Sequence, residues 1–158
     1  MHMAFDIGTK MGLAWTDDEH PESYLFGYLD YTGKQYKNRG VRYLAFRMFL
    51  DDWQPVPETI YYERVRRHNG TDAAHVYGGF MAVLEMYCVL KQIPLVGLEV
   101  ASIKQHATGK GNADKEAMLE AARNEFGYDG DNDNEADALW ILDLGVQKSC
   151  THKVPVLV

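Results

Sequence analysis

Apolar residues alternate or cluster in short stretches along the first fifth of the chain, which predicts strands. Two such stretches, residues 4–8 and 11–16, are joined through Thr9 and Lys10, and a third covers residues 24–30. The short connections predict that the chain opens with an antiparallel β-meander.

The apolar spacing changes to a helical period after Gly33. One helical face then collects Val41, Leu44, Ala45, Met48 and Phe49. Pro55 and Pro57 end this helix. The pattern continues with strands at 59–63 and 94–98 and helices at 72–92, 101–108, 113–126 and 135–148. The tail after Cys150 has no assigned pattern.

The order of these elements predicts a single α/β domain over residues 1–158. Three antiparallel strands come first and the later strands are linked through helices, so we expect a mixed sheet flanked by helices on both faces. Gly78 and Gly79 interrupt the helix at 72–92. Each glycine should cost about 1 kcal/mol relative to alanine, which predicts that another helix packs closely there.

Charge is distributed unevenly along the chain. The formal net charge of -7 argues against tight, non-specific binding to duplex DNA. Residues 31–50 nevertheless carry no acid, and their bases are Lys34, Lys37, Arg39, Arg42 and Arg47. Residues 129–143 carry six acids and no base. This segregation predicts one surface that can meet phosphates and another that can gather cations.

Neither a membrane segment nor a disulfide framework is predicted. No apolar run approaches the roughly 20 residues that span a bilayer, and the N-terminus lacks a signal peptide pattern. We therefore expect a cytosolic protein with no membrane partner, in which Cys88 and Cys150 are reduced and structural. The remaining histidines have no metal-ligand spacing and are expected to be structural or exposed: His20, His75, His106 and His152.

Three acidic residues stand where a carboxylate can carry chemistry. Asp6 lies in an apolar strand, where an ionised carboxylate is costly unless it is paired or bound to metal; an exposed strand face is the alternative. Glu63 ends a strand, at the edge where open α/β sheets often place active sites, and an ion pair with Arg64 or Arg66 is the alternative. Asp137 lies on a helix beside small alanines, with a solvated helix face as the alternative.

Carboxylates from separate elements suit phosphodiester hydrolysis by two metal ions. Two Mg²⁺ or Mn²⁺ ions about 4 Å apart need hard oxygen ligands, one ion activating water and the other stabilising the leaving oxygen. Asp129, Asp131 and Asp133 imitate the start of a calcium loop, but Asn134 and Trp140 stand where that loop needs glycine and glutamate. The calcium loop is therefore excluded.

Four segments together resemble the RuvC-type Holliday junction resolvases, nucleases of the RNase H-like/integrase superfamily. In order they are FDIGT at 5–9, YYERV at 61–65, SIKQHATGKGNADK at 102–115 and NEADAL at 134–139. The first alone is weak, since a similar strand opens sugar kinases and actin-like ATPases. The resemblance implies an RNase H-like fold, Mg²⁺- or Mn²⁺-dependent cutting of four-way DNA junctions, and a bacterial or phage-infected host cell. It also implies a homodimer, for which the Gly78–Gly79 helix is our candidate contact.

The resemblance also implies roles for individual residues. It maps the family's first aspartate, its glutamate and its last aspartate to Asp6, Glu63 and Asp137, with Asp6 bridging two ions. It places Lys104 and Lys115 near the scissile phosphate.

Two loops are predicted to contact the DNA backbone. Gly109 and Gly111 flank Lys110 before a helix and could form an anion-binding corner, although no serine or threonine completes a nucleotide-binding phosphate loop. The second loop follows Glu63 and carries Arg64, Arg66, Arg67 and His68. Solvated loops are the alternative for both.

Two positions depart from the family pattern. Arg66 stands where the better-known bacterial members carry an aromatic wedge, so their mode of opening a junction and their sequence preference are not carried over. Asn134 stands where those members carry an acid or histidine. On a helix Asn134 shares a face with Asp137, whereas Asp133 could supply a charge instead. The fourth metal ligand is therefore open between Asn134 and Asp133.

Three other functions are compatible with parts of this pattern. A different RNase H-like nuclease, acting on flaps, forks or RNA–DNA hybrids, would need the same metal chemistry. An ATP-binding module of the actin and sugar-kinase type needs paired domains, for which 158 residues leave no room. A catalytically silent DNA-binding protein is disfavoured by the acidic net charge and the three separately placed carboxylates.

Overall fold

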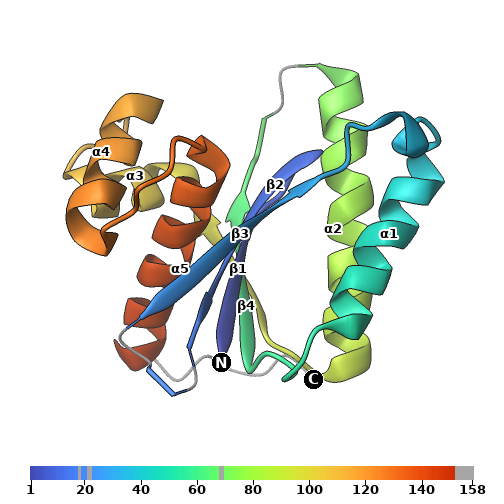
Figure 1. Cartoon of the computed structure of the whole chain (residues 1–158), viewed down its shortest axis with the longest axis horizontal. Coiled ribbons are helices and arrows are strands. Elements are labelled where there is room, and N and C mark those ends of the chain that lie inside the picture. Colours follow the sequence, from blue (N-terminus) through green and yellow to red (C-terminus); the bar gives the residue numbers. More distant parts are fainter. Residues whose placement is uncertain (18, 21–22, 68–69, 152–158) are drawn as a thin grey trace.

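Five strands and five α-helices form the described part of the computed structural model, residues 1–17, 19–20, 23–67 and 70–151 (Figure 1). The strands are β1 (His2–Asp6), β2 (Lys10–Thr16), β3 (Tyr24–Asp30), β4 (Thr59–Arg64) and β5 (Leu95–Glu99). The helices are α1 (Arg39–Asp52), α2 (Thr71–Lys91), α3 (Val100–Thr108), α4 (Lys115–Phe126) and α5 (Asp133–Thr151), with a 3-10 turn η1 (Lys34–Tyr36) before α1. Each predicted strand and helix is present, with ends shifted by only a few residues.

The strands form one mixed sheet in the order β3-β2-β1-β4-β5. The β1–β2 and β2–β3 pairs are antiparallel, and the β1–β4 and β4–β5 pairs are parallel. The predicted α/β class, with three antiparallel strands followed by parallel ones, is confirmed. Because β1 and β4 run in the same direction, their carboxyl ends meet at one edge of the sheet.

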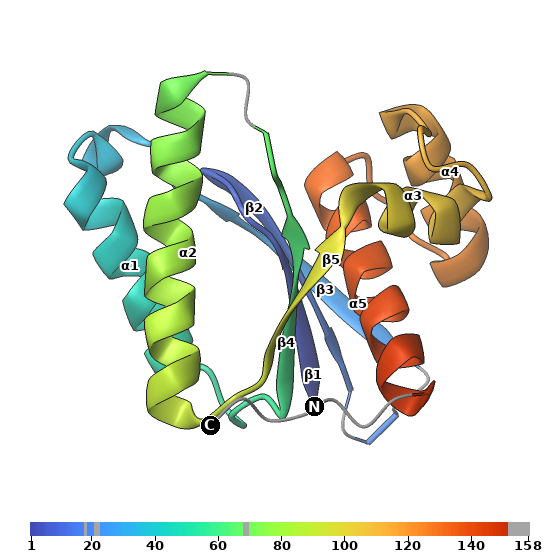
Figure 2. The same ribbon diagram turned by 180° about the vertical axis from the view of Figure 1, so that it is seen from behind.

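Helices cover both faces of the sheet, as Figures 1 and 2 show from opposite sides. On one face α1 and α2 pack with Phe5 and Ile60 into an aromatic core that includes Phe46 and Phe80. On the other face α3, α4 and α5 pack against a core that includes Ala4 and Tyr61. Successive side chains of each strand therefore belong to different cores.

Two glycines let helices approach their neighbours closely. A Cβ atom at Gly79 would overlap the Tyr43 ring of α1, so the prediction that a helix packs closely there is confirmed for this glycine. Nothing lies within 4 Å of the corresponding position at Gly78. A Cβ atom at Gly12 would overlap the backbone carbonyl of Asn134, so the first turn of α5 rests directly on β2.

Two helices differ from the sequence expectation in what they expose. In α1 the predicted face is divided: Ala45 and Phe49 pack against the core, whereas Val41, Leu44 and Met48 are 43%, 59% and 56% exposed. Phe46 and Leu50, outside that face, are buried. The helix α2 is long and apolar enough to cross a membrane by length and composition alone, a property that was not singled out from the sequence. Within this fold α2 packs one side on the sheet and on α1.

The cysteine prediction can be followed for one residue. Cys88 is a free thiol buried in α2, and burial raises its pKa to about 12. The Cys150 side chain, His152 and the tail at 152–158 lie outside the described part of the structure.

Candidate active site

Asp6 and Glu63 stand side by side at the carboxyl ends of β1 and β4. Each follows directly after a registered residue pair of these two parallel strands, so the two residues are level with each other. Ala4 and Tyr61, two residues earlier, belong to the core under α5. Because side chains i and i+2 of a strand share a face, Asp6 and Glu63 also point toward the α5 side.

The first turns of α5 bring the third carboxylate to this edge. The Asn132 side chain caps the helix by accepting a hydrogen bond from the Asn134 backbone N–H at 3.1 Å. Gly12, which pairs with Asp6 across β1 and β2, leaves the space in which the Asn134 carbonyl lies. Asp137 follows one turn later, and its negative charge acts on Asp6.

Burial and mutual repulsion raise the pKa of all three carboxyl groups. Burial first, then repulsion by Asp137 and Glu63, raises the pKa of Asp6 well above its usual range. Burial and the Asp137 charge raise the pKa of Glu63 to about 7, and burial with the Asp133 charge raises that of Asp137 to about 6. The ionised forms are therefore costly unless positive charge is supplied. Asp6 and Asp137 are both partly buried, so the alternatives of an exposed Asp6 and a fully solvated Asp137 do not hold.

The donor chemistry of this cluster fits hard divalent cations. Carboxylate oxygens are the ligands that Mg²⁺ and Mn²⁺ prefer, and a bound cation would offset the repulsion between the three groups. Within the described ranges, no three acidic, histidine or cysteine side chains already stand in chelating positions. The fit thus rests on three carboxylates facing one side from three elements, and closing a coordination shell requires their side chains to move together.

Two lysines border the carboxylates from α3 and α4. The Lys115 ammonium forms an ion pair with Asp133 at the start of α5. The Lys104 Nζ atom donates a hydrogen bond to the Ala113 carbonyl at 2.7 Å. Both charges lower the pKa of Asp137. Both lysines thus act electrostatically on the carboxylate cluster, while their expected place near the scissile phosphate stays a prediction.

The two candidates for the fourth ligand have different surroundings. The Asn134 Nδ2 atom donates to the Asn132 side-chain oxygen at 3.1 Å, which orients its amide. Asp133 is held by Lys115, yet its charge contributes to the raised pKa of Asp137. Asn134 thus offers the site a neutral amide, whereas Asp133 contributes a negative charge.

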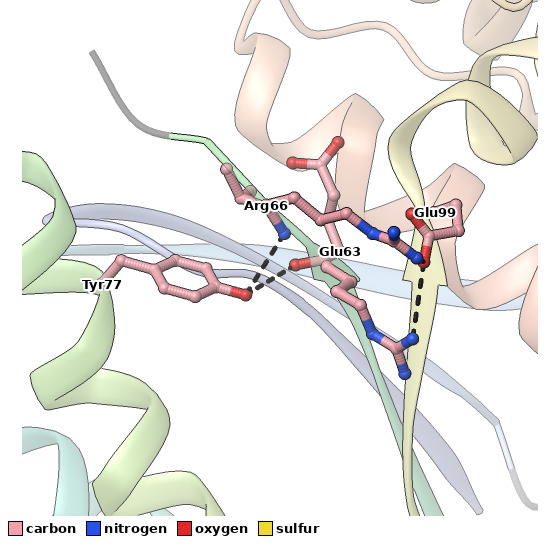
Figure 3. A network of polar contacts seen from close by, with 6 residues as sticks. Glu63, Arg66, Tyr77 and Glu99 are labelled. Atoms are coloured by element: carbon pink, nitrogen blue, oxygen red, sulfur yellow. Dashed lines mark hydrogen bonds and ion pairs between the residues drawn. The ribbon is translucent and has the colours of Figure 1, made fainter.

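The arginines after Glu63 pair with another acid. Arg66 Nη2 and Arg64 Nη1 lie 2.7 and 3.4 Å from one carboxylate oxygen of Glu99 (Figure 3). Among the described residues, Arg64 and Arg66 thus pair with Glu99 and not with Glu63, so the ion-pair alternative for Glu63 is wrong. Arg67 is exposed, as is Lys110 in the loop between α3 and α4. His68 lies outside the described residues.

Tyr77 of α2 is a site residue that the sequence did not reveal. Its hydroxyl donates to the Glu63 backbone carbonyl at 3.0 Å and accepts from the Val65 N–H at 3.4 Å (Figure 3). These bonds hold the chain where β4 ends and the basic loop begins. An aromatic residue one turn and a half into α2 was the available signal, but nothing local links it to Glu63.

A second polar network ties the helical layer together away from the carboxylates. Asp143 of α5 contacts His106 Nε2 at 2.5 Å and accepts from the Tyr24 hydroxyl at 2.9 Å. The His106 ring also packs edge-on against Trp140. This agrees with a structural role for His106, which joins α3, α5 and β3.

The basic segment at 31–50 lies next to the turn that follows Asp6. The Tyr31 backbone N–H donates to the Thr9 carbonyl at 2.7 Å. Beyond Tyr31, a cavity of about 450 Å³ is lined by Thr32, Gly33, Lys34, Tyr36, Lys37 and Arg42. The bases at 31–50 thus lie on the α1 side, where Arg39 and Arg47 pair with Asp72 and Asp51, and the acids of α5 lie on the other face of the sheet.

Known folds identify the architecture more clearly than known sequences do. No family model and no curated protein matches the chain. Thermus thermophilus RuvC bound to a Holliday junction substrate matches with a TM-score of 0.70 and 18% identity, over 89% of each chain. A second Thermus thermophilus RuvC structure matches with a TM-score of 0.73 and 18% identity, over 95% of each chain.

A eukaryotic protein shares the fold at greater distance. The yeast mitochondrial Holliday junction resolvase Ydc2 matches with a TM-score of 0.58 and 12% identity, over 89% of this chain and 75% of Ydc2. At identities this low, the structural matches establish the fold alone, and any activity has to be argued from the residues of the site. The chain therefore has the RNase H-like α/β fold shared by the RuvC and Ydc2 resolvases.

Proposed function

We propose that this protein is a structure-selective endodeoxyribonuclease that cuts four-way DNA junctions by two-metal-ion phosphodiester hydrolysis. The observation that carries the proposal is the convergence of Asp6, Glu63 and Asp137 at one edge of the sheet, with raised pKa values. The structural similarity to a RuvC that binds a Holliday junction supports the choice of substrate.

The proposal assigns a task to each side chain. Asp6, Glu63 and Asp137 would hold two Mg²⁺ or Mn²⁺ ions, with Asp6 shared between them and Glu63 and Asp137 each serving one. When bound, the ions supply an activated water and stabilise the leaving oxygen. Lys104 and Lys115 orient the scissile phosphate by charge, which requires Lys115 to exchange its Asp133 partner for the phosphate.

The DNA-binding surface extends from the site across the same edge of the sheet. Phosphate contacts fix the position of a protein on DNA, and exposed arginines and lysines make them. We assign this role to Arg64, Arg66, Arg67 and Lys110. The cavity lined by Lys34, Lys37 and Arg42 offers a further contact on the α1 side. The net charge of -7 then reflects the acids elsewhere on the molecule.

A homodimer suits a substrate with two equivalent strands to cut. The Gly78–Gly79 contact needs revision, because Tyr43 of the same chain already fills the space at Gly79. The outward sides of α1 and α2 offer a broader apolar surface instead: Val41, Leu44, Met48, Met86, Val89 and Leu90. The last two are 77% and 66% exposed, which is unusual for large apolar side chains on neighbouring positions. We propose that a second copy of the chain covers this surface.

A panel of labelled substrates tests the proposed function. It contains a four-way junction, a flap, a fork, plain duplex and an RNA–DNA hybrid of matched sequence, each incubated with and without Mg²⁺. We expect Mg²⁺-dependent, paired cuts in the junction and little cutting of plain duplex. Preferred cutting of flaps, forks or the hybrid would assign the same site to another RNase H-like nuclease. No cutting of any substrate with Mg²⁺ or Mn²⁺ would refute a nuclease.

A further inference from the structure

Glu99 holds two of the cations that the proposed function assigns to DNA. One of its carboxylate oxygens lies 2.7 Å from Arg66 Nη2 and 3.4 Å from Arg64 Nη1. All three side chains remain accessible, at 72% for Arg66, 49% for Arg64 and 41% for Glu99. The contact is therefore open to solvent beside the strand ends that carry Asp6 and Glu63.

The strand register explains why Glu99 reaches these arginines. Glu99 is the last residue of the edge strand β5 and pairs directly with Arg64 of β4. Gly97, two residues earlier on the same face, leaves room for Arg64, because a Cβ atom there would lie 2.8 Å from the Arg64 Nε atom. Glu99 also occupies the N-cap position of α3 but makes no side-chain cap hydrogen bond. Its carboxylate is thus committed to the arginines.

Stability alone is a weak reason for this arrangement. Exposed ion pairs contribute little to folding, because solvent screens them and two long side chains lose freedom. Arg66 lowers the pKa of Glu99, so the carboxylate is ionised at neutral pH. An ionised carboxylate occupies an arginine in the same way as a phosphate oxygen does, since both accept its N–H groups. Glu99 and a DNA phosphate therefore compete for the same donors.

We propose that Glu99 is a specificity-determining residue that occupies Arg66 and Arg64 in the free protein and yields them only when DNA seats at the active site. This inference rests on the proposed function. A linear duplex offers the arginines only phosphates. Breaking their ion pairs with Glu99 therefore offsets part of the free energy that duplex binding gains. A junction that also engages both protomers has further contacts with which to displace Glu99. The pair thus restrains binding to undamaged, unbranched DNA.

Equilibrium binding to Glu99→Gln tests the proposal. Fluorescence anisotropy of a labelled linear duplex and a four-way junction is measured in EDTA, where the proposed cutting cannot proceed. Freeing the arginines should tighten duplex binding about 2- to 5-fold, the range that exposed ion pairs span. Junction binding should tighten less, which narrows the ratio of the two affinities.

The salt dependence and a matched control separate competition from a general charge effect. In the wild type, breaking the ion pair leaves a carboxylate that takes up a cation. The slope of log K against log salt should therefore steepen by about 1 in Glu99→Gln. Glu125→Gln on α4 removes the same charge at an exposed position and should leave both quantities unchanged.

A double-mutant cycle with Arg66→Gln completes the test. If Glu99 acts by occupying Arg66, Glu99→Gln gains little in the Arg66→Gln background. An equal gain in both backgrounds, or a Glu99→Gln affinity equal to that of the Glu125→Gln control, overturns the proposal while leaving the proposed function intact. If the wild type binds no junction at all, the proposed function fails and this inference fails with it. Thermal denaturation of each variant verifies that it is folded.

Discussion

The two helical layers of this molecule are built in different ways. Beneath α1 and α2 the core is aromatic, with Phe5, Tyr31, Phe46 and Phe80 in edge-on or tilted contact. Beneath the first turns of α5 the sheet and helix meet through small residues, Ala4, Gly12, Ala14, Ala136 and Ala138, and the Tyr61 ring packs on Gly145 further along the helix. Large side chains fill volume and stabilise, whereas small ones let a helix approach the sheet closely.

The two layers therefore have different roles. The aromatic layer stabilises the fold, and the α5 layer holds the carboxylates. Close approach of α5 places Asp137 next to the strand ends that carry Asp6 and Glu63, at the cost of burying three carboxylates together. The aromatic layer contains no comparable group among its described buried residues. Substitutions in the α5 layer should therefore change catalysis and metal binding, and those in the α1–α2 layer should change stability.

The largest expected effect is on cutting, from the carboxylate layer. Asp6→Asn, Glu63→Gln and Asp137→Asn should each lower junction cutting at least about 100-fold, because each removes a charge that holds a catalytic ion. Binding of the junction should persist, as measured by gel shift. Asp129→Asn, an exposed acid before α5, is the control and should cut normally. Substantial Mg²⁺-dependent cutting by one of the three variants would remove that residue from the site.

In the aromatic layer the expected effect is on folding. Phe46→Ala removes a fully buried ring that contacts Phe5 and Phe80, and should lower the free energy of unfolding by about 3–5 kcal/mol. Urea denaturation measures this loss. Mg²⁺ should still raise the melting temperature of the variant, since its carboxylates are untouched. A variant that loses its response to Mg²⁺ while staying folded would contradict the separation of the two layers.

A smaller effect should decide the fourth ligand. Asn134→Asp replaces a neutral oxygen with a carboxylate, so it should lower the Mg²⁺ concentration for half-maximal cutting by roughly tenfold. Asp133→Asn should shift this concentration less, because Asp133 is already paired with Lys115. The opposite pattern, with Asp133→Asn inactive and Asn134→Asp unchanged in the metal titration, would assign the fourth position to Asp133.

The smallest effect concerns the hydrogen bonds of Tyr77, which join α2 to the end of β4. Tyr77→Phe removes the hydroxyl that fixes the Glu63 and Val65 backbone. A hydrogen bond of this kind is worth about 1 kcal/mol, so kcat should fall about 5-fold. KM for the junction should change little because the ring remains in place, and the melting temperature should fall by about 2–4 °C. An unchanged kcat would show that Glu63 is held without Tyr77.

Most of the fold follows from local patterns in the sequence. Short connections between the first three strands fix an antiparallel meander, and helices between later strands fix parallel pairing. The orientation of α1 did not follow. Its sequence carries one apolar stripe through Val41, Leu44 and Met48 and another through Phe46 and Leu50, and only the position of the sheet decides which is buried.

The charged residues of the candidate site could be singled out from the sequence, whereas their hydrogen-bond and ion-pair partners could not. Asp6, Glu63 and Asp137 stand out because acids interrupt apolar patterns. Glu99 and Tyr77 carry no such signal, because their roles depend on the β4–β5 register and on the placement of α2. Gly12 likewise gains its meaning only from the docking of α5.

The central claim is that three half-buried carboxylates repel one another and share divalent cations. Their folded-state pKa values lie above the usual ones, at about 7 for Glu63 and about 6 for Asp137. The folded state therefore binds more protons than the unfolded state. Without metal, stability should fall as the pH rises from about 4 through 7, and then level off.

Thermal denaturation of the wild type and Asp6→Asn at pH 8, in EDTA and across a Mg²⁺ titration, tests this claim most directly. In EDTA the Asp6→Asn protein should melt at a higher temperature than the wild type, because one buried charge and its repulsion are gone. Mg²⁺ should raise the wild-type melting temperature, with about 2.7 kcal/mol of stabilisation at 100 times the dissociation constant, and should leave Asp6→Asn nearly unchanged. Equal Mg²⁺ responses in the two proteins, or a wild type that gains stability from pH 5 to pH 8 in EDTA, would contradict the account.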